Sequence, residues 1–226
     1  MCQMIAENDR EKIRNILKNV LGIESYIGLE RMGGMTNHSY KVIVPNRSIY
    51  AVRLPGEGTE ALINREAERV STELACQLKI DAELLYFGED GIKITRYIPE
   101  AETMSPETMR EKRHIRQVAE ILRKLHGSGE NTGVPFEVFD MADGYEKVIR
   151  ESNVPMFSDY EEMKAQVMIL KTEIDAGGPV VRVPCHNDPL CENWIMNGDG
   201  RLYLIDWEYA GMNDGMWDVG CRGCFP

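Results

Sequence analysis

Hydrophobic and polar positions follow two different rhythms along the chain, and the change between them falls near Pro99. In the first part, the stretches "SYKVIV", "IYAVRL", "AELLYFG" and "IKITRYI" show the apolar, β-branched and aromatic character of short strands. Apolar residues at three- and four-residue spacing predict helices at residues 8–21 and 59–78. We therefore expect a sheet-rich first part that carries two helices.

Helical spacing dominates after Pro99. Ser105 and Pro106 form a typical N-cap and first-turn pair, so a helix is expected to begin there. Two further helices are predicted at residues 143–152 and 159–175. Short strands then return at "NWIMN" and "LYLID", which are joined by a Gly-Asp-Gly turn.

These elements predict an α+β protein with two lobes. A β-rich first lobe takes residues 1–98, and a mainly helical second lobe takes residues 99–226. The connector between them lies near residues 96–100. Clefts between lobes commonly hold ligands, so we expect the binding site beside this connector.

Composition narrows the classes of function. The chain has 226 residues, of which 43% are hydrophobic, and this suffices for a packed core. The net charge of -11 argues against a nucleic-acid-binding protein and is compatible with a small cationic substrate. No apolar run approaches the length of a membrane span, and the charged N-terminus is typical of an amphipathic helix rather than of a signal peptide.

Six cysteines are scattered along the chain without the spacing of a disulfide framework, so we expect a reducing, cytoplasmic setting. Cys221 and Cys224 could form half of a zinc site. The sequence contains no second pair with matching spacing, and we favour incidental cysteines as the interpretation.

The stretch "CHNDPLCENW" concentrates polar side chains that suit phosphoryl transfer. It contains His186, Asp188 and Asn193, and Asp206 ends the apolar run "LYLID" one hairpin later. A carboxylate can accept the proton of an attacking hydroxyl, while an amide oxygen and a second carboxylate are hard ligands that Mg²⁺ prefers. We assign Asp188 as the catalytic base, Asn193 and Asp206 as magnesium ligands, and His186 as the residue that orients the loop.

Each half of this pattern also has a purely structural explanation. Aspartate and asparagine often cap turns, and buried strands often end in aspartate. The two halves occur together across a predicted hairpin, and this combination favours the catalytic interpretation.

The first lobe offers candidates for holding the phosphates of ATP. Gly33 and Gly34 precede a strand, where backbone N–H groups could approach phosphate. Thr36 and Asn37 could add side-chain donors. A turn without a ligand is the simpler interpretation of the glycine pair.

Arg53 and Glu66 each place a charge in an apolar setting. Arg53 shares its strand face with Ile49 and Ala51, and Glu66 lies in line with Val70 on the predicted helix. Because unpaired buried charges are costly, we predict an ion pair between Arg53 and Glu66 that holds Arg53 against the α- and β-phosphates. The alternative is that both residues are exposed and never meet.

Taken together, these motifs resemble the choline/ethanolamine kinase family, whose bilobal protein-kinase-like fold is shared with aminoglycoside phosphotransferases. "HNDPLCEN" is similar to the family's catalytic loop, and "LIDWEYA" is similar to its metal-binding segment. "YAVRLPG" followed by "INREAE" resembles its nucleotide-binding strand and helix. "TRYI" resembles the connector that binds adenine through its backbone, which makes Arg96, Tyr97 and Ile98 candidates for nucleotide binding.

The resemblance implies an ATP- and Mg²⁺-dependent kinase that phosphorylates the hydroxyl of choline or ethanolamine. It also implies that Asp218 braces the catalytic loop. The positive charge of choline cannot donate a hydrogen bond, so its recognition needs aromatic faces and carboxylates. Glu208 and Tyr209 are the leading candidates to bind it, together with Trp207, although Trp207 could equally be a core residue.

Family members continue through further helices after the segment that matches "WDVG", whereas here "CRGCFP" follows. We therefore expect an incomplete second lobe. Three functions stay open: a choline or ethanolamine kinase, a phosphotransferase for an aminoglycoside or another amino alcohol, and a truncated nucleotide-binding remnant without catalysis.

Overall fold

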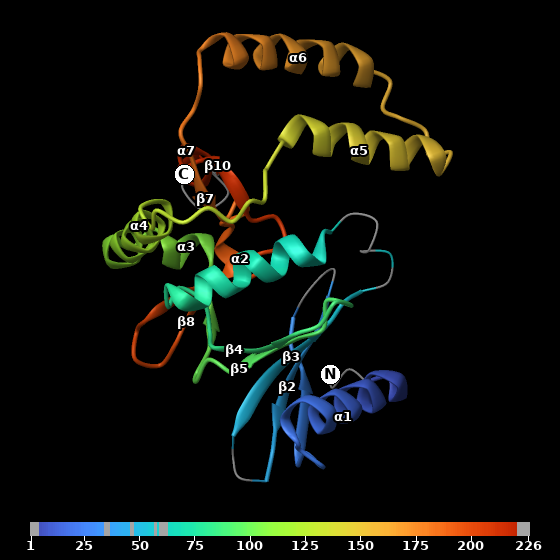
Figure 1. Ribbon diagram of the computed structural model, residues 1–226, viewed down its shortest axis with the longest axis vertical. Helices are drawn as coiled ribbons and strands as arrows, with labels where there is room; N and C mark the ends of the chain where they lie inside the picture. The colour runs from blue at the N-terminus through green and yellow to red at the C-terminus, as the bar shows by residue number, and fades with distance from the viewer. Residues whose placement is uncertain (1–4, 34–36, 46–47, 57, 59–62, 221–226) are drawn as a thin grey trace.

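A computed structural model describes most of the chain in three layers (Figure 1). A sheet with one helix forms one end, a mixed middle layer follows, and two long helices form the other end. The described residues are 5–33, 37–45, 48–56, 58 and 63–220. Four residues with predicted roles, Gly34, Thr36, Cys221 and Cys224, lie outside them.

A five-stranded antiparallel sheet in the order β1-β2-β3-β5-β4 forms the first half of the structure. Its strands are β1 (Gly28–Arg31), β2 (His38–Ile43), β3 (Ile49–Leu54), β4 (Leu84–Phe87) and β5 (Lys93–Arg96). The register places Arg53 opposite Ser39 on β2 and opposite Lys93 on β5. The strands predicted from sequence are confirmed, and β1 adds an edge strand that the sequence pattern missed.

Helix α1 (Glu7–Leu21) packs against this sheet and confirms the helix predicted at residues 8–21 (Figure 1). Ile13 and Leu17 are buried in the same core cluster as Tyr40 of β2. The helix ends at Gly22, where a φ of 66° favours glycine because a side chain would be strained there.

A buried polar contact fixes α1 to the sheet. Asp9 accepts a hydrogen bond from the Tyr40 hydroxyl, and its Oδ2 lies 3.0 Å from Nδ1 of His38. Burial alone would raise the pKa of Asp9, but the bonds from Tyr40 and His38 hold that pKa below its ordinary value. The Asp9 carboxylate therefore stabilises the fold in its charged form.

Replacing Asp9 by asparagine is expected to lower the free energy of unfolding by about 1–2 kcal/mol at neutral pH, because a charge-assisted bond is lost. A carboxylate whose pKa is lowered in the folded state stabilises the fold at pH values above its pKa in the unfolded state. This contribution is lost as the pH falls through the pKa of the folded state. The difference between wild type and Asp9→Asn should therefore shrink below about pH 4. Urea unfolding at neutral pH and below pH 4 measures this difference, and the exposed Glu7→Gln serves as control. An equal loss of stability in Asp9→Asn and Glu7→Gln would contradict the role of the buried contact.

Helix α2 (Arg65–Gln77) links the sheet to the second half (Figure 1). It begins later than the predicted residue 59, because the side chain of Asn64 accepts the N–H of Ala67 at 3.1 Å and caps the helix. Its residue Ala75, and Ile80 beyond its end, belong to the core cluster of the second half. Packing thus ties α2 to the later residues, and a lobe boundary at residue 98 stays a proposal.

The second half combines helices with two small antiparallel sheets, β10-β7 and β6-β8-β9. The predicted helix after Ser105 is two helices, because the capping box of Ser105 and Thr108 starts a single turn that is followed by a second start at Lys112. The helices are α3 (Pro106–Met109), α4 (Lys112–His126), α5 (Val138–Glu151), α6 (Tyr160–Ala176) and α7 (Met216–Gly220). The strands are β6 (Glu102–Thr103), β7 (Arg182–Cys185), β8 (Trp194–Met196), β9 (Leu202–Leu204) and β10 (Gly211–Asp214).

Helices α5 and α6 confirm the helices predicted at residues 143–152 and 159–175, but they bury none of their residues. They are joined by ion pairs of Arg150 on α5 with Glu161 on α6 and of Lys164 on α6 with Glu146 on α5. Apolar side chains including Ile169 and Leu170 stay exposed on α6. Among the described residues, no helix combines the length and the apolar character needed to cross a membrane.

Candidate active site

The predicted catalytic loop leaves β7 at Cys185 and is held in place by a buried histidine. Nδ1 of His186 accepts the backbone N–H of Asp188 at 3.3 Å. Its Nε2 then carries the proton and donates to the carbonyl oxygen of Ile205 at 2.9 Å. His186 therefore joins the loop to the end of β9, and this geometry suits an orienting role.

Asp218 of α7 lies beneath the same loop with its side chain fully buried. Its carboxylate accepts the N–H groups of His186 at 3.0 Å and of Asn187 at 2.7 Å. Nε2 of His126, at the end of α4, lies 2.8 Å from the same carboxylate. Asp218 thus fixes the backbone turn at Asn187, where φ is 67°.

Asp188 and Asn193 contact each other directly. The Asn193 amide nitrogen donates to the backbone oxygen of Asp188 at 2.8 Å and lies 3.3 Å from its Oδ2. Burial raises the pKa of Asp188, and the negative charge of Asp206 raises it further.

Asp206 follows β9 in a left-handed backbone conformation with a φ of 69°. The backbone N–H of the preceding residue, Ile205, donates to the backbone carbonyl oxygen of Asn193 at 2.9 Å. Nη1 of Arg53 lies 3.8 Å from Oδ1 of Asp206. The structure therefore sets Asp206 beside the segment that carries Asp188 and Asn193, with Arg53 close to Asp206.

The donor set at this point fits Mg²⁺. It consists of a carboxylate and an amide, and hard oxygen ligands are those that Mg²⁺ prefers. Because the amide nitrogen of Asn193 donates to Asp188, the amide oxygen is the atom that would coordinate a cation. Asp206 would supply the carboxylate.

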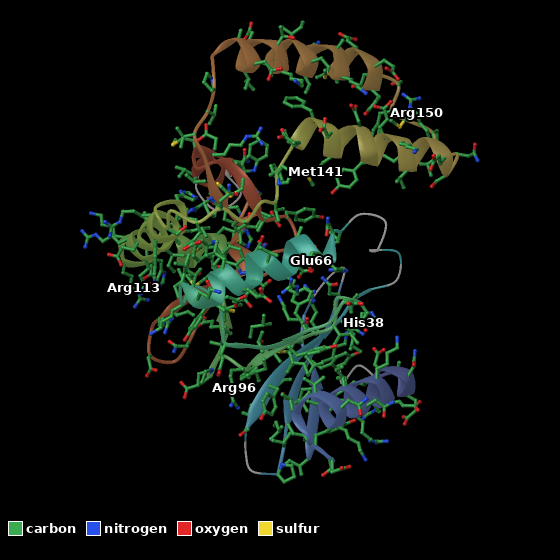
Figure 2. The ribbon with its side chains drawn as sticks, viewed as in Figure 1. His38, Glu66, Arg96, Arg113, Met141 and Arg150 are labelled. Atoms are coloured by element: carbon green, nitrogen blue, oxygen red, sulfur yellow. The ribbon has the colours of Figure 1, made fainter. Side chains whose placement is uncertain are left out.

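The predicted ion pair between Arg53 and Glu66 is wrong. Arg53 donates Nη1 to Glu68 and Nη2 to the carbonyl oxygen of Gly91 at 3.0 Å. Glu66 is exposed on α2 and instead receives two bonds from Arg69, at 2.9 and 2.6 Å. The buried face of α2 is rotated away from the apolar stripe used for the prediction, and it carries Glu68 rather than Glu66, which Figure 2 labels on this helix.

Glu68 is fully buried and is surrounded by positive charge. Nη1 of Arg65 donates to its Oε2 at 2.8 Å, and Nζ of Lys93 lies 4.0 Å from its Oε1. Burial alone would raise the pKa of Glu68, but the bond from Arg53 outweighs it and lowers that pKa. Glu68 therefore stays ionised as the counterion of Arg53.

Glu208 faces the first half of the chain. Its Oε2 accepts the Asn37 amide at 3.2 Å and lies 3.9 Å from Nη1 of Arg65. Burial raises its pKa, and the charge of Asp206 contributes. Asn37 and Glu208 thus lie next to each other and near Arg65, and the role predicted for Glu208 at the acceptor stays a prediction.

The remaining nucleotide-binding candidates lie along the sheet. No other described atom lies within 4 Å of the place that a side chain on Gly33 would take, which fits a turn open to a ligand. Tyr97 donates its N–H to Ile49 at 3.1 Å. Arg96 turns its side chain outward to Glu83, so an adenine contact through Arg96, Tyr97 or Ile98 stays a prediction for the backbone.

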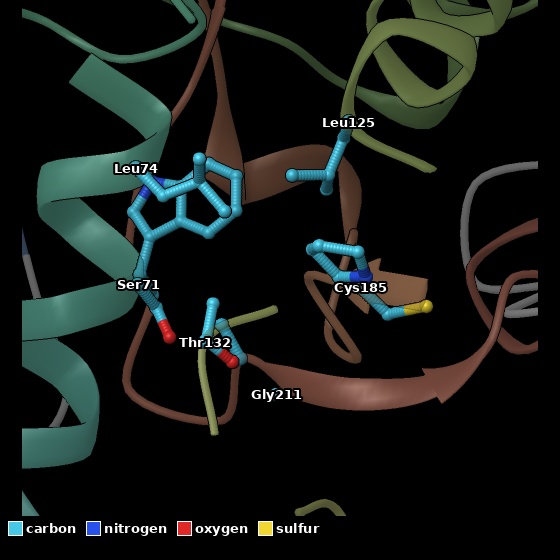
Figure 3. A pocket seen from close by; sticks show the side chains of 9 residues that line it. Ser71, Leu74, Leu125, Thr132, Cys185 and Gly211 are labelled. Atoms are coloured by element: carbon cyan, nitrogen blue, oxygen red, sulfur yellow. The ribbon is translucent and has the colours of Figure 1, made fainter. Parts of the chain in front are cut away.

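Trp207 is a core residue, and the prediction that it binds substrate is wrong. Its side chain is 1% exposed, its indole N–H donates to Leu204 at 3.2 Å, and its ring packs edge-on against His186. It also lines a cavity of about 10 Å³ beside Ser71 and Cys185 (Figure 3). That volume holds about one water molecule, so the cavity cannot take a nucleotide or choline.

Tyr209 is half-buried beside the catalytic loop. Burial raises its pKa, as do the nearby Tyr145 of α5 and the charges of Glu208 and Asp188. Its backbone oxygen accepts the Asn187 amide at 2.9 Å. An aromatic pair from two distant segments therefore lies close to the predicted base.

Sequence reasoning missed Glu68, Arg65 and Tyr145. A signal existed for Glu68, since the small or polar residues Ser71, Thr72 and Ala75 share its helical spacing and are buried with it. Tyr145 had no such signal, because its partner is far away in the chain.

Comparisons with known proteins identify relatives over most of the chain. The profile of the family described as choline/ethanolamine kinase matches residues 30–222. Protein LicA of Haemophilus influenzae is 29% identical over 85% of this chain and 56% of its own length. A probable ethanolamine kinase of Arabidopsis thaliana is 32% identical over 87% of this chain and 56% of its own length. The chain thus spans about half the length of these relatives.

Solved structures show the same relationship. The choline kinase LicA of Streptococcus pneumoniae superposes with a TM-score of 0.84 at 35% identity, over 95% of this chain and 74% of that one. LicA in complex with AMP gives 0.82 at 36% identity, over 93% and 72%. Spectinomycin phosphotransferase, at 13% identity and a TM-score of 0.60 over 94% and 73%, shares the fold alone. From its profile match and its shared fold, the chain belongs to the choline/ethanolamine kinase family.

Proposed function

We propose that the protein transfers the γ-phosphoryl group of ATP to the hydroxyl of a small amino alcohol, either choline or ethanolamine. One observation carries the proposal. Asp188 contacts Asn193, Asp206 follows a residue that is hydrogen-bonded to Asn193, and Nη1 of Arg53 lies 3.8 Å from Asp206. Phosphoryl transfer needs a base, metal ligands and a cation for the phosphates in this proximity.

The residues divide the reaction among them. Asp188 orients the acceptor hydroxyl and takes its proton, so that the alcohol oxygen forms a bond to the γ-phosphorus. The bond between that phosphorus and the β–γ bridging oxygen breaks, and ADP leaves. Arg53 faces the nucleotide phosphates, and Asn193 and Asp206 would hold Mg²⁺, which supplies charge neutralisation there.

The acceptor follows from the charge and the rings beside the base. Tyr209 and Tyr145 offer aromatic faces near Asp188, and a quaternary or primary ammonium binds such faces when a carboxylate is close. The relatives named choline kinase and ethanolamine kinase support the same class of acceptor.

An acceptor panel tests the proposal. Purified protein with Mg-ATP is given choline, ethanolamine, an aminoglycoside or no acceptor, while ADP release and the phosphorylated product are measured together. We expect ADP in equal amount to phosphocholine or phosphoethanolamine. Transfer only to the aminoglycoside would replace the acceptor class, and nucleotide binding without any transfer would identify a non-catalytic remnant.

A further inference from the structure

Two arginines share one buried carboxylate at the phosphate side of the site. Arg53 donates to Oε1 of Glu68, and Arg65 donates to Oε2 at 2.8 Å. The side chains of Arg53 and Arg65 are only 8% and 9% exposed, and Glu68 is fully buried. Glu68 thus holds two guanidinium groups side by side.

Gly91 is in contact with both arginines. Its carbonyl oxygen accepts Nη2 of Arg53 at 3.0 Å. A side chain at this glycine would come within 2.7 Å of Cδ and Nε of Arg65, and its φ of 80° also favours glycine. The absence of a side chain therefore lets the stem of Arg65 lie directly against the residue that anchors Arg53.

Arg65 also connects the two halves of the chain. Its Nη1 lies 3.9 Å from Oε2 of Glu208, and Arg53 lies 3.8 Å from Asp206, two residues earlier. Each arginine therefore has one carboxylate in common with the other, Glu68, and one across the site.

The charges around Glu68 determine what the loss of Arg65 would do to Arg53. On its own side of the site, Glu68 pairs with both arginines and lies 4.0 Å from Lys93, while Asp206 and Glu208 face Arg53 and Arg65 from the other side at 3.8 and 3.9 Å. Without Arg65, the charge of Glu68 would fall mainly on Arg53, and Arg53 would attract phosphates less.

We propose that Arg65 is a positioning residue for the nucleotide: by sharing Glu68 it leaves positive charge on Arg53 for the phosphates, and Glu208 opposes this charge from across the site. The inference rests on the proposed function, since it assumes that phosphates bind beside Arg53. It assigns Arg65 and Glu208 opposite signs of effect on the affinity for a nucleotide.

The test measures the dissociation constant of ADP with divalent metal chelated, so that metal binding by Asp206 does not enter. Arg65→Gln is expected to weaken ADP binding about tenfold, whereas Arg65→Lys stays within about threefold of wild type because the charge remains. Glu208→Gln is expected to bind ADP about threefold more tightly than wild type. Arg69→Gln, an exposed change on the same helix, serves as control with unchanged affinity.

Wild-type affinity in Arg65→Gln would overturn the proposal. So would an equal loss in Arg65→Lys, or a loss in Glu208→Gln as large as that in Arg65→Gln, because these results would mean that the pair only holds the two halves together. If Arg65→Gln does not fold, as thermal melting would show, Glu208→Gln still decides the sign, because an affinity for ADP at or below that of the wild type in Glu208→Gln would overturn the proposal. A wild-type protein that does not bind ADP would instead refute the proposed function itself.

Discussion

Replacing Asp188 by asparagine is expected to lower kcat for phosphoryl transfer by about 10²- to 10⁴-fold, the contribution typical of a general base. The amide keeps the shape of the side chain and can still contact Asn193, which lies 3.3 Å from Oδ2 in the wild type. What it loses is the ability to take the proton of the acceptor hydroxyl. The affinity for ADP should stay within about threefold, because phosphate contacts are assigned to other residues.

Asp199→Asn provides the matched control for this change. Asp199 is an exposed aspartate in the turn between β8 and β9, close in sequence but without a predicted role. Its turnover is expected to equal that of the wild type. If Asp188→Asn retained most of the turnover with choline or ethanolamine, Asp188 would not be the base.

The placement of Asp188, Asn193 and Asp206 in the chain's fold could be predicted from the sequence because its geometry is local. Asp188 and Asn193 are five residues apart, and the hairpin of β8 and β9 returns the chain to Asp206. Spacing within one loop and one hairpin leaves little freedom, so the residue pattern alone was enough to expect that the three side chains converge.

The contacts between distant segments could not be predicted in the same way. Asn37 meets Glu208 across 171 residues, and Tyr209 meets Tyr145 of a helix whose start the apolar pattern placed too late. The apolar periodicity of α2 pointed to Glu66, because Glu66 lies in line with the apolar residues of the helix. The buried face of this helix is instead partly polar. A helix that lines a charged site presents polar residues inward, and the apolar rule then selects the wrong side.

The side chain of Trp207 shows a related ambiguity. A tryptophan next to a metal-binding aspartate can stack on a cationic ligand or fill the core, and composition does not separate these uses. The fold decides, because β9 directs Trp207 into the cluster with Trp194 and Leu204, while Tyr209 stays at the surface of the site.

Glu68→Gln is expected to be the most destabilising of the changes considered, with a loss of about 3–5 kcal/mol in the free energy of unfolding. The amide cannot balance the charges of Arg53 and Arg65, which are themselves buried. The pKa of Glu68 in the folded protein lies below its ordinary value. The stabilisation by Glu68 is therefore present at pH values above the ordinary pKa and is lost as the pH falls through the lowered pKa. The difference in the free energy of unfolding between wild type and Glu68→Gln should therefore be largest near neutral pH and should disappear in acid.

Glu66→Gln is the matched control, since it makes the same chemical change two residues earlier on the same helix. Glu66 is exposed and pairs with Arg69, so its replacement should leave unfolding by urea close to wild type, because exposed pairs contribute little. The comparison distinguishes the two possible partners of Arg53. A larger loss in Glu66→Gln than in Glu68→Gln would restore the pairing suggested by the apolar pattern and would contradict the packing of α2 against the site.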